Sequence, residues 1–221
     1  WLEPHEIKSR VPLIDISDSA RYPIKGGLLQ PRAGIARHDA VAWGYARQAD
    51  AYGVDIIENC EVTGFEISTG KITGVQTTRG TIKAGKVGTA VAGHTGHVAA
   101  MAGIRLPIET HVLQAMVSEP IKPCIDTVIT SGAVHCYISQ SNKGELVMGG
   151  DLDFYNSYAQ RGNFPRIEDV ISSVISMFPA FGRLRLLRTW GGVMDMSMDG
   201  SPIISKTDIQ GFYINGGWCY G

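Results

Sequence analysis

The sequence lacks several features that would assign it to a common functional class. Its 221 residues contain only four cysteines, which are far apart and form no C-x-x-C pair, so neither a zinc site nor a disulfide scaffold is indicated. No run of about 18 apolar residues predicts a membrane span. The 20 basic and 21 acidic residues form no basic cluster that would favour nucleic acid. We therefore expect a protein of the reducing cytoplasm without a nucleic-acid, membrane or metal partner.

The G-x-G-x-x-G fingerprint of dinucleotide-binding folds is also absent. In a complete chain this absence would argue against a bound dinucleotide. The sequence, however, begins at Trp1 instead of a methionine and stops in a glycine-rich loop just after Trp218. We therefore expect a piece of a longer protein, although composition alone does not separate truncation from a true lack of the cofactor.

The pattern of apolar residues predicts a mixed α/β fold. Its first part should contain a helix, a short strand, an antiparallel meander, an apolar strand and a second helix. These elements are expected over residues 39–52, 54–57, 61–84, 87–92 and 97–102. Their order resembles a Rossmann-like sheet with an inserted β-meander, as in FAD-binding domains of the amino-acid oxidase type.

A second, mixed-sheet domain is expected over residues 106–189, while residues 1–105 and 190–221 belong to the FAD-binding domain. The second domain should carry the substrate and catalytic residues. Strand patterns and one amphipathic helix support it, at residues 111–118, 133–140, 145–150 and 167–178.

His38 stands out because of the run Ala36-Arg37-His38-Asp39-Ala40-Val41-Ala42-Trp43. Asp39 is a suitable N-cap, and apolar residues then recur at helical spacing, so His38 is predicted to lie at the start of a helix. There the amide donors and the positive end of the helix dipole favour a neutral ring that can act as a nucleophile or hydrogen-bonding partner. From the spacing alone, a loop histidine that only satisfies backbone groups is the alternative.

The same run resembles the beta subunit of heterotetrameric sarcosine oxidase, and the resemblance covers essentially the whole chain. In that family the corresponding histidine carries FMN through a covalent bond between a ring nitrogen and the flavin 8α carbon, and His38 matches it. The resemblance implies that sarcosine is oxidised at a noncovalent FAD and that electrons pass to the covalent FMN, where oxygen is reduced. It also implies alpha, gamma and delta subunits as partners.

Two other functions are open. One is a dimethylglycine or proline dehydrogenase-type flavoprotein subunit, which shares the architecture. The other is a non-catalytic domain that docks to a partner subunit. Because the nucleotide-binding segment is expected to lie outside residues 1–221, we expect these residues alone to bind flavin weakly or not at all.

In the strand predicted over residues 133–140, alternation places Cys136 and Ile138 on one face and His135 and Tyr137 on the other. The imidazole and the phenol can line a cavity and orient a small amine substrate, or they can simply face water. In sarcosine oxidase-like enzymes the corresponding strand presents histidine and tyrosine side chains over the flavin. The resemblance therefore implies that His135 and Tyr137 are catalytic.

The run Tyr213-Ile214-Asn215-Gly216-Gly217-Trp218 resembles the closing part of the family, where a glycine loop approaches the flavin ring. Glycines let the backbone come within hydrogen-bond reach of a flat ring, although tight turns need the same residues. The resemblance implies cofactor binding by Gly216, Gly217 and Cys219, and by the backbone of Val62. Many relatives have glycine at the position of Cys219, which here either crowds the cofactor or only changes the path of the loop.

Overall fold

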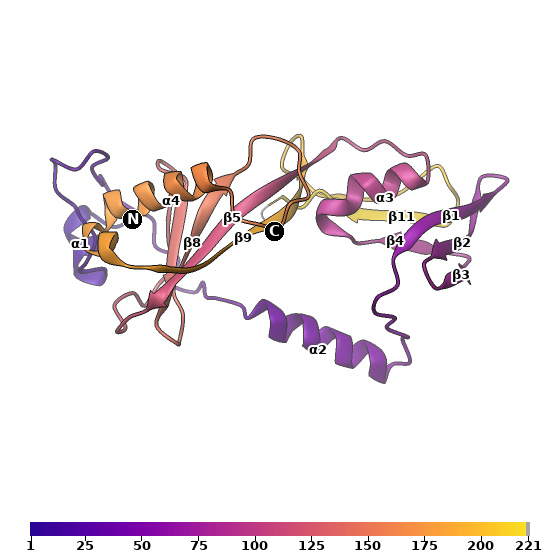
Figure 1. Ribbon diagram of the computed structural model, residues 1–221, viewed down its shortest axis with the longest axis horizontal. Coiled ribbons are helices and arrows are strands. Elements are labelled where there is room, and N and C mark those ends of the chain that lie inside the picture. The colour runs from indigo at the N-terminus through magenta and orange to yellow at the C-terminus, as the bar shows by residue number, and fades with distance from the viewer. Residues whose placement is uncertain (220–221) are drawn as a thin grey trace. The chain divides into compact units, whose positions relative to one another are not determined.

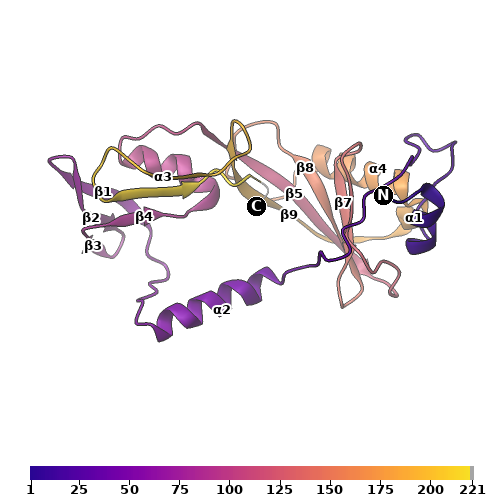
Figure 2. The ribbon, with the colours of Figure 1, turned by 180° about the vertical axis from the view of Figure 1, so that it is seen from behind.

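The computed structural model describes residues 1–219, which form two compact units (Figures 1 and 2). Each unit is assembled from two separate stretches of sequence. The first contains residues 1–35 and 112–192, and the second contains residues 36–111 and the segment that begins at Val193. Within the described residues, no helix is long and apolar enough to cross a membrane.

The first unit is built on a five-stranded sheet with the strand order β6-β7-β8-β5-β9. The strands are β5 (Ile108–Pro120), β6 (Ile129–Ser131), β7 (Cys136–Gln140), β8 (Glu145–Leu152) and β9 (Leu186–Ser197). Helix α4 (Phe164–Met177) packs against β7 and β8, which are labelled beside it in Figure 2. Its apolar stripe is buried there, which confirms the amphipathic helix that the spacing predicts: Ile167, Val170, Val174 and Met177.

Residues 1–35 pack against this sheet, not against the segment that follows them in sequence. Val11 and Ile14, which come after helix α1 (Pro4–Arg10), are buried in the same apolar cluster as Met116 and Phe178. The backbone N–H of Asp15 also donates to the carbonyl of Met177, at 2.8 Å. The compact units therefore divide the chain differently from the expected domains, which grouped residues 1–35 with 36–105. A short 3₁₀ helix, η2 (Pro179–Arg183), follows α4.

The second unit holds two small three-stranded sheets. The meander is formed by β1 (Val62–Ser68), β2 (Lys71–Thr77) and β3 (Gly80–Lys83), all antiparallel as predicted. The other sheet has the order β10-β11-β4 and consists of β10 (Ile203–Lys206), β11 (Phe212–Gly216) and β4 (Val87–Thr89). Strand β11 pairs with β4 in parallel, although residues 90–211, which are 122 residues, lie between them in sequence. This parallel pair belongs to the mixed α/β fold that the sequence predicts.

The core of the second unit contains Ile72, Phe212 and Ile214, with Phe65 edge-on to Phe212 at a ring distance of 4.9 Å. The 3₁₀ helix η1 (Ala92–His94) leads into helix α3 (Thr95–Met101), which contacts β1 and β11. Gly216 lies against this helix, because a Cβ atom there would come within 2.6 Å of the Thr95 hydroxyl. The close approach requires glycine at this position.

Three predicted strands differ from the structure, and one of them, predicted over residues 87–92, ends at Thr89, because Ala92 already begins η1. Residues 54–57 form no strand, and Val54, Ile56 and Ile57 are each about half exposed. Among the described residues 1–219, no neighbouring strand is available for this apolar run to pair with, and pairing is what makes a short apolar run a strand. The strand predicted over 133–140 begins only at Cys136 and is preceded by a turn.

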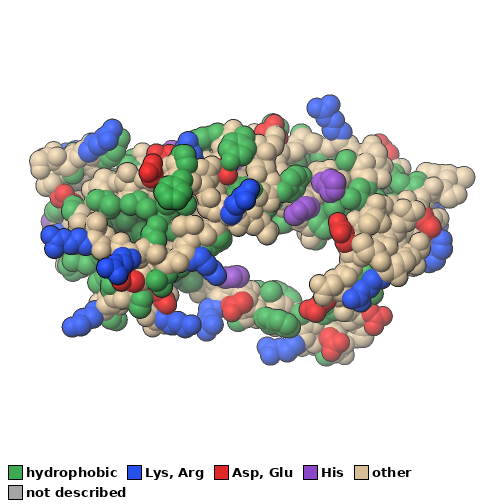
Figure 3. All heavy atoms as spheres, viewed as in Figure 1, with side chains coloured by type: hydrophobic (Ala, Val, Ile, Leu, Met, Phe, Trp, Pro, Cys, Tyr) green, Lys and Arg blue, Asp and Glu red, His purple; other side chains and the backbone are tan. Residues whose placement is uncertain are grey.

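Helix α2 (His38–Ala51) buries none of its residues. Its N-cap is Arg37, so Asp39 lies inside the first turn and was wrongly predicted to be the cap. The predicted apolar stripe is exposed, with 47% of Val41 and 77% of Tyr45 accessible. Hydrophobic side chains are visible between charged ones on the surface of this helix (Figure 3). A helix with such a surface is stabilised when another surface covers it.

Candidate active site

His38 is the first residue of α2, as the sequence predicts, and its side chain is exposed. Within residues 1–219 its ring has no hydrogen bond and no ion pair. The neighbouring Arg37 and Asp39 interact with each other at 3.9 Å. Both nitrogens of the His38 ring are therefore open to a group from outside the chain.

Tyr137 lies on the sheet face opposite α4. Its neighbours in β7, Cys136 and Ile138, belong to the apolar cluster that α4 covers, so alternation turns Tyr137 to the other side. There it pairs with Gly149 of β8, where a Cβ atom would lie 2.6 Å from the Tyr137 hydroxyl. The absence of a side chain at Gly149 makes room for the phenol, a requirement that the sequence alone did not reveal.

Burial raises the pKa of the Tyr137 phenol above its ordinary value. The phenol therefore keeps its proton at neutral pH and can act as a hydrogen-bond donor. Ser139, two residues along the same face, is also half buried. This face of β7 is partly covered, which favours the predicted cavity-lining role over a strand face open to water.

His135 does not lie in the strand with Tyr137. It occupies the turn before β7, is exposed, and has a φ of 47°, in the left-handed region. The alternation argument therefore fails for His135, because a residue outside the pleat has no fixed face. Its position two residues before Tyr137 keeps it at the same end of the strand, and its catalytic role stays a prediction.

The glycine loop follows β11 in the second unit. Gly217 has a φ of 78° and Cys219 a φ of 55°. Such values favour glycine, which explains in backbone terms why glycine suits the position of Cys219. The Cys219 thiol lies 3.7 Å from the Ser197 hydroxyl, so the loop is held to the end of β9. Tyr220 and Gly221, which continue the motif in sequence, lie outside the described residues.

Asp195 is a residue of this site that the sequence reasoning missed. It lies on β9 and is only 4% exposed. Its Oδ2 accepts the backbone N–H of Gly217 at 2.5 Å, and its backbone carbonyl accepts the N–H of Cys219 at 3.0 Å. Two donors of the loop are thus bound within the chain. The sequence signal that could have found it is an acidic residue between two apolar methionines, in the run Met194-Asp195-Met196.

We expect Asp195→Ala to destabilise the protein by about 1–3 kcal/mol, because the buried N–H of Gly217 would lose its acceptor. Chemical denaturation of the full-length protein, followed by circular dichroism, measures this change. Asp208→Ala is the matched control, since Asp208 is exposed and has no hydrogen-bond or salt-bridge partner within residues 1–219. Equal stability of the two variants would show that the carboxylate does not hold the loop.

Val62 is the first residue of β1, where it pairs with Thr77 of β2. Because the meander has the order β1-β2-β3, β1 is an edge strand, and part of its backbone faces away from the sheet. A backbone contact at Val62 is therefore sterically possible. Residues 1–219 contain no group of three His, Cys, Asp or Glu side chains that could hold a metal ion.

The candidate residues divide between the two units. His135 and Tyr137 belong to the first unit, whereas His38, Val62, Gly216, Gly217 and Cys219 belong to the second. Within the second unit, the loop residues are joined to Asp195 and Ser197 by the contacts described above. His38 makes no contact of this kind.

Comparisons with known proteins agree with this architecture. The chain is 60% identical over 215 residues to sarcosine oxidase subunit beta of Rhizobium meliloti, a match that covers 97% of the chain and 51% of that protein. It is 55% identical to the corresponding subunit of an Arthrobacter species, with 100% of the chain and 55% of that protein covered. The chain thus spans about half the length of these curated relatives.

Solved structures show the same fold. L-proline dehydrogenase from P. horikoshii superposes with a TM-score of 0.89 at 30% identity, covering 99% of the chain and 58% of that structure. Glycine oxidase from Geobacillus kaustophilus gives 0.86 at 18% identity, covering 99% and 57%. The family model described as FAD dependent oxidoreductase matches residues 1–221. From its first residue to its last, the chain belongs to this family of FAD dependent oxidoreductases.

Proposed function

We propose that the protein acts in the flavin-dependent oxidative demethylation of sarcosine, as the beta subunit of a heterotetramer with alpha, gamma and delta subunits. The observation that carries this proposal is the 60% identity to a sarcosine oxidase subunit beta over 97% of the chain. The FAD dependent oxidoreductase family supplies the class of chemistry. The exposed apolar side chains of α2 support a protein whose helix is covered by another subunit in the assembly. We place this assembly in the cytoplasm.

We further propose that His38 is the attachment residue for FMN. Its exposed ring, without a partner among residues 1–219, fits a group that needs one ring nitrogen for a covalent bond. The backbone of Val62 and the loop from Gly216 to Cys219 would hold the noncovalent FAD. When bound, FAD accepts the two electrons of substrate oxidation and FMN passes electrons on to oxygen.

The side chains of this chain would bind and orient the substrate. Tyr137 has a protonated phenol that donates a hydrogen bond to the substrate. Because the phenol is partly buried, water is excluded from that side of the substrate. His135 accepts the proton of the substrate amine, so that the nitrogen lone pair is free during the transfer. Asp195 keeps the glycine loop in one conformation through its bond to Gly217.

A second candidate function is an L-proline dehydrogenase-type flavoprotein subunit. The specific observation in its favour is the TM-score of 0.89 and 30% identity to L-proline dehydrogenase from P. horikoshii. The identity to the sarcosine oxidase subunits is about twice as high, which favours sarcosine. Both candidates require the same fold and the same flavin.

Anaerobic mixing of the purified full-length complex with sarcosine, dimethylglycine or L-proline tests the proposal. We expect sarcosine to bleach the bound FAD with the highest kcat/KM of the three. Faster bleaching by L-proline or dimethylglycine would contradict the proposal and identify that compound, instead of sarcosine, as the preferred substrate. Failure of all three compounds to bleach a flavin-loaded complex would favour a non-catalytic docking domain.

A further inference from the structure

The sheet face that carries Tyr137 has a row of paired residues that runs across neighbouring strands. Tyr137 of β7 pairs with Gly149 of β8, and Gly149 in turn pairs with Ala115 of β5. The phenol reaches over the second strand of this row, since a Cβ atom at Gly149 would lie 2.6 Å from the Tyr137 hydroxyl. Only β5, with the small side chain of Ala115, therefore separates the hydroxyl from β9, the next strand of the sheet.

The contacts between β9 and β5 show how β9 continues the row. A Cβ atom at Gly191 would lie 2.3 Å from the side chain of Val112. At the other end of the pair, the backbone N–H of Glu119 donates to the carbonyl of Arg185 at 2.8 Å. Residue numbers fall along one strand as they rise along the other, so β9 is antiparallel to β5.

Arg188 is the residue of β9 that lies beside Ala115. It comes three residues before the first of these contacts on β9, and Ala115 comes three residues after it on β5. The next residue, Thr189, faces α4, because a Cβ atom at Gly162 would touch both its hydroxyl, at 2.4 Å, and Ile167 of α4, at 2.8 Å. Side chains alternate along a strand, so Arg188 points to the opposite face, which is the face of the phenol.

Arg188 is the only lysine or arginine in the five strands of this sheet, all of which lie within the described residues. Its side chain is exposed, and within residues 1–219 it has no carboxylate partner. The guanidinium carbon lies 4.8 Å from the ring centre of Trp190, two residues along the same face. Stacking of this kind orients the flat group and leaves its N–H edge free for the two oxygens of a carboxylate.

The phenol and the guanidinium are close enough to hold one small molecule between them. The Tyr137 hydroxyl lies over Gly149, and two strand spacings, about 10 Å, separate the backbone of Gly149 from that of Arg188. An arginine side chain is long enough to cover most of this distance. A short amino acid above Ala115 can therefore contact both groups.

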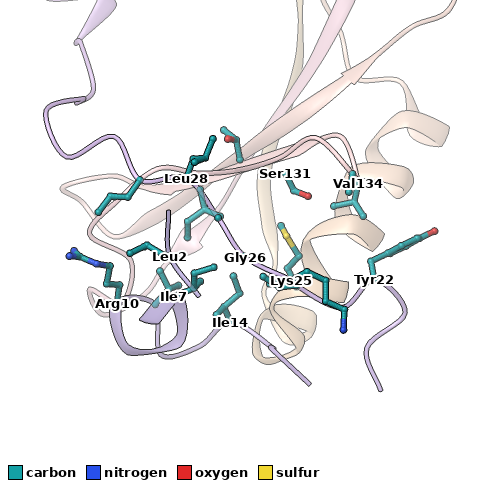
Figure 4. Close-up of a pocket in the computed structure, with 18 of the residues that line it drawn as sticks. Leu2, Ile7, Arg10, Ile14, Tyr22, Lys25, Gly26, Leu28, Ser131 and Val134 are labelled. Carbon is teal, nitrogen blue, oxygen red and sulfur yellow. The ribbon is translucent and has the colours of Figure 1, made fainter. Parts of the chain in front are cut away.

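The opposite end of the row leads to a cavity of about 570 Å³, shown in Figure 4, because Thr130 of β6 pairs with the row's tyrosine and lines this cavity. Its basic lining residues do not converge on one point. Lys25 already has a carboxylate partner at 2.9 Å. Arg10 points away from the space in Figure 4, and Tyr22, over whose ring Arg21 lies at 5.4 Å, is at the other end of it. The cation that suits a carboxylate in this row therefore lies at the β9 end.

We propose that Arg188 anchors the carboxylate of the amino-acid substrate, while Tyr137 donates a hydrogen bond to the same molecule. The inference rests on the proposed oxidation of sarcosine and adds the residue that distinguishes an acid from a neutral amine. The charge pair holds the short carbon chain above Ala115 and fixes which end of the substrate faces the phenol. A neutral molecule of the same shape lacks this contact.

Methoxyacetate and methoxyacetamide test the anchor by binding alone, because they have the shape of sarcosine but no amine to oxidise. Isothermal titration of the flavin-loaded full-length complex should give the acid at least ~10-fold higher affinity than the amide. Arg188→Gln removes the charge and keeps the apolar stem that packs on Trp190. It should weaken binding of the acid by about 10- to 100-fold and change binding of the amide by less than ~2-fold.

Arg188→Lys and Arg185→Gln are the controls. The lysine keeps the charge without the planar fork, so it should restore part of the affinity for the acid, and its acid-specific loss decides if Arg188→Gln does not fold. Arg185 is an exposed arginine just before β9 and outside the row, so Arg185→Gln should leave both affinities unchanged. No loss in a folded Arg188 variant, an equal loss for acid and amide, or the same loss in Arg185→Gln would overturn the proposal.

Anaerobic reduction by sarcosine separates this inference from the proposed function. In the Arg188→Gln complex, the sarcosine concentration that gives half of the maximal rate of FAD reduction should rise by about 10- to 100-fold, with a smaller change in the maximal rate. Bleaching of the wild type by sarcosine, together with an unchanged half-saturation in the variant, would overturn the anchor alone. A flavin-loaded wild type that sarcosine does not bleach would overturn the proposed function and, with it, the role of Arg188.

Discussion

His38→Ala in the full-length complex should abolish covalently bound FMN and leave FAD in place. The ring of His38 is exposed at the start of α2, and no other residue in its run offers an imidazole nitrogen for the bond. Substrate should still reduce the FAD, whereas formation of hydrogen peroxide should collapse because electrons no longer reach oxygen by their usual route. Precipitation with acid, followed by the absorbance spectrum of the redissolved polypeptide, measures the covalent flavin directly.

His97→Ala is the control for this experiment. His97 is an exposed histidine on α3 in the same unit, and its replacement should leave the amount of covalent flavin unchanged. If the His38→Ala polypeptide stays yellow after precipitation, the flavin is attached to another residue. If wild-type protein releases all of its flavin, the proposed linkage does not exist.

Tyr137→Phe should slow reduction of the bound FAD by substrate by about 10- to 1000-fold, which corresponds to about 1–4 kcal/mol. The change removes only the hydroxyl that we propose to orient the substrate, and it leaves the ring that packs over Gly149. Because burial raises the pKa of this phenol, its proton stays bound at neutral pH. The loss should therefore be similar across about pH 6 to 9. Rapid mixing under anaerobic conditions measures the single-turnover rate.

Two further variants separate orientation of the substrate from a general effect on the strand. Gly149→Ala places a methyl group 2.6 Å from the Tyr137 hydroxyl and 2.7 Å from the Gln114 carbonyl of β5, so it should displace the phenol, slow the same step and also lower the stability of the sheet, which Tyr137→Phe should not do. Ser139→Ala changes the next side chain on the same face of β7 and should have a smaller effect. Comparable rates in wild type and Tyr137→Phe would remove Tyr137 from the active site. We expect His135→Ala to lower the rate over a similar range.

Several features could be predicted from the sequence because they depend on neighbours in the chain. The stripe of α4, the meander from Val62 to Lys83 and the position of His38 at a helix start all follow from residues a few places apart. The start of β7 was predicted less well. The turn before it places His135 at a φ of 47°, a conformation that an alternating pattern does not reveal.

The resemblance to a family, supported by the match over residues 1–221, supplied the functional class and the candidate residues. Periodicity alone left the roles of His38 and Tyr137 open. A histidine at a helix start and a tyrosine on a strand are common in proteins of many functions. Their chemistry depends on what surrounds them, and local spacing does not contain that information.

The tertiary structure decided what depends on residues far apart in sequence. It joined residues 1–35 to the sheet of residues 112–192, through the burial of Val11 and Ile14 beside Phe178. It also placed Gly149 under Tyr137 and bound the N–H of Gly217 to the carboxylate of Asp195, 22 residues away. These arrangements follow from the close packing and the hydrogen-bond requirements of a buried interior, which act between residues regardless of their distance along the chain.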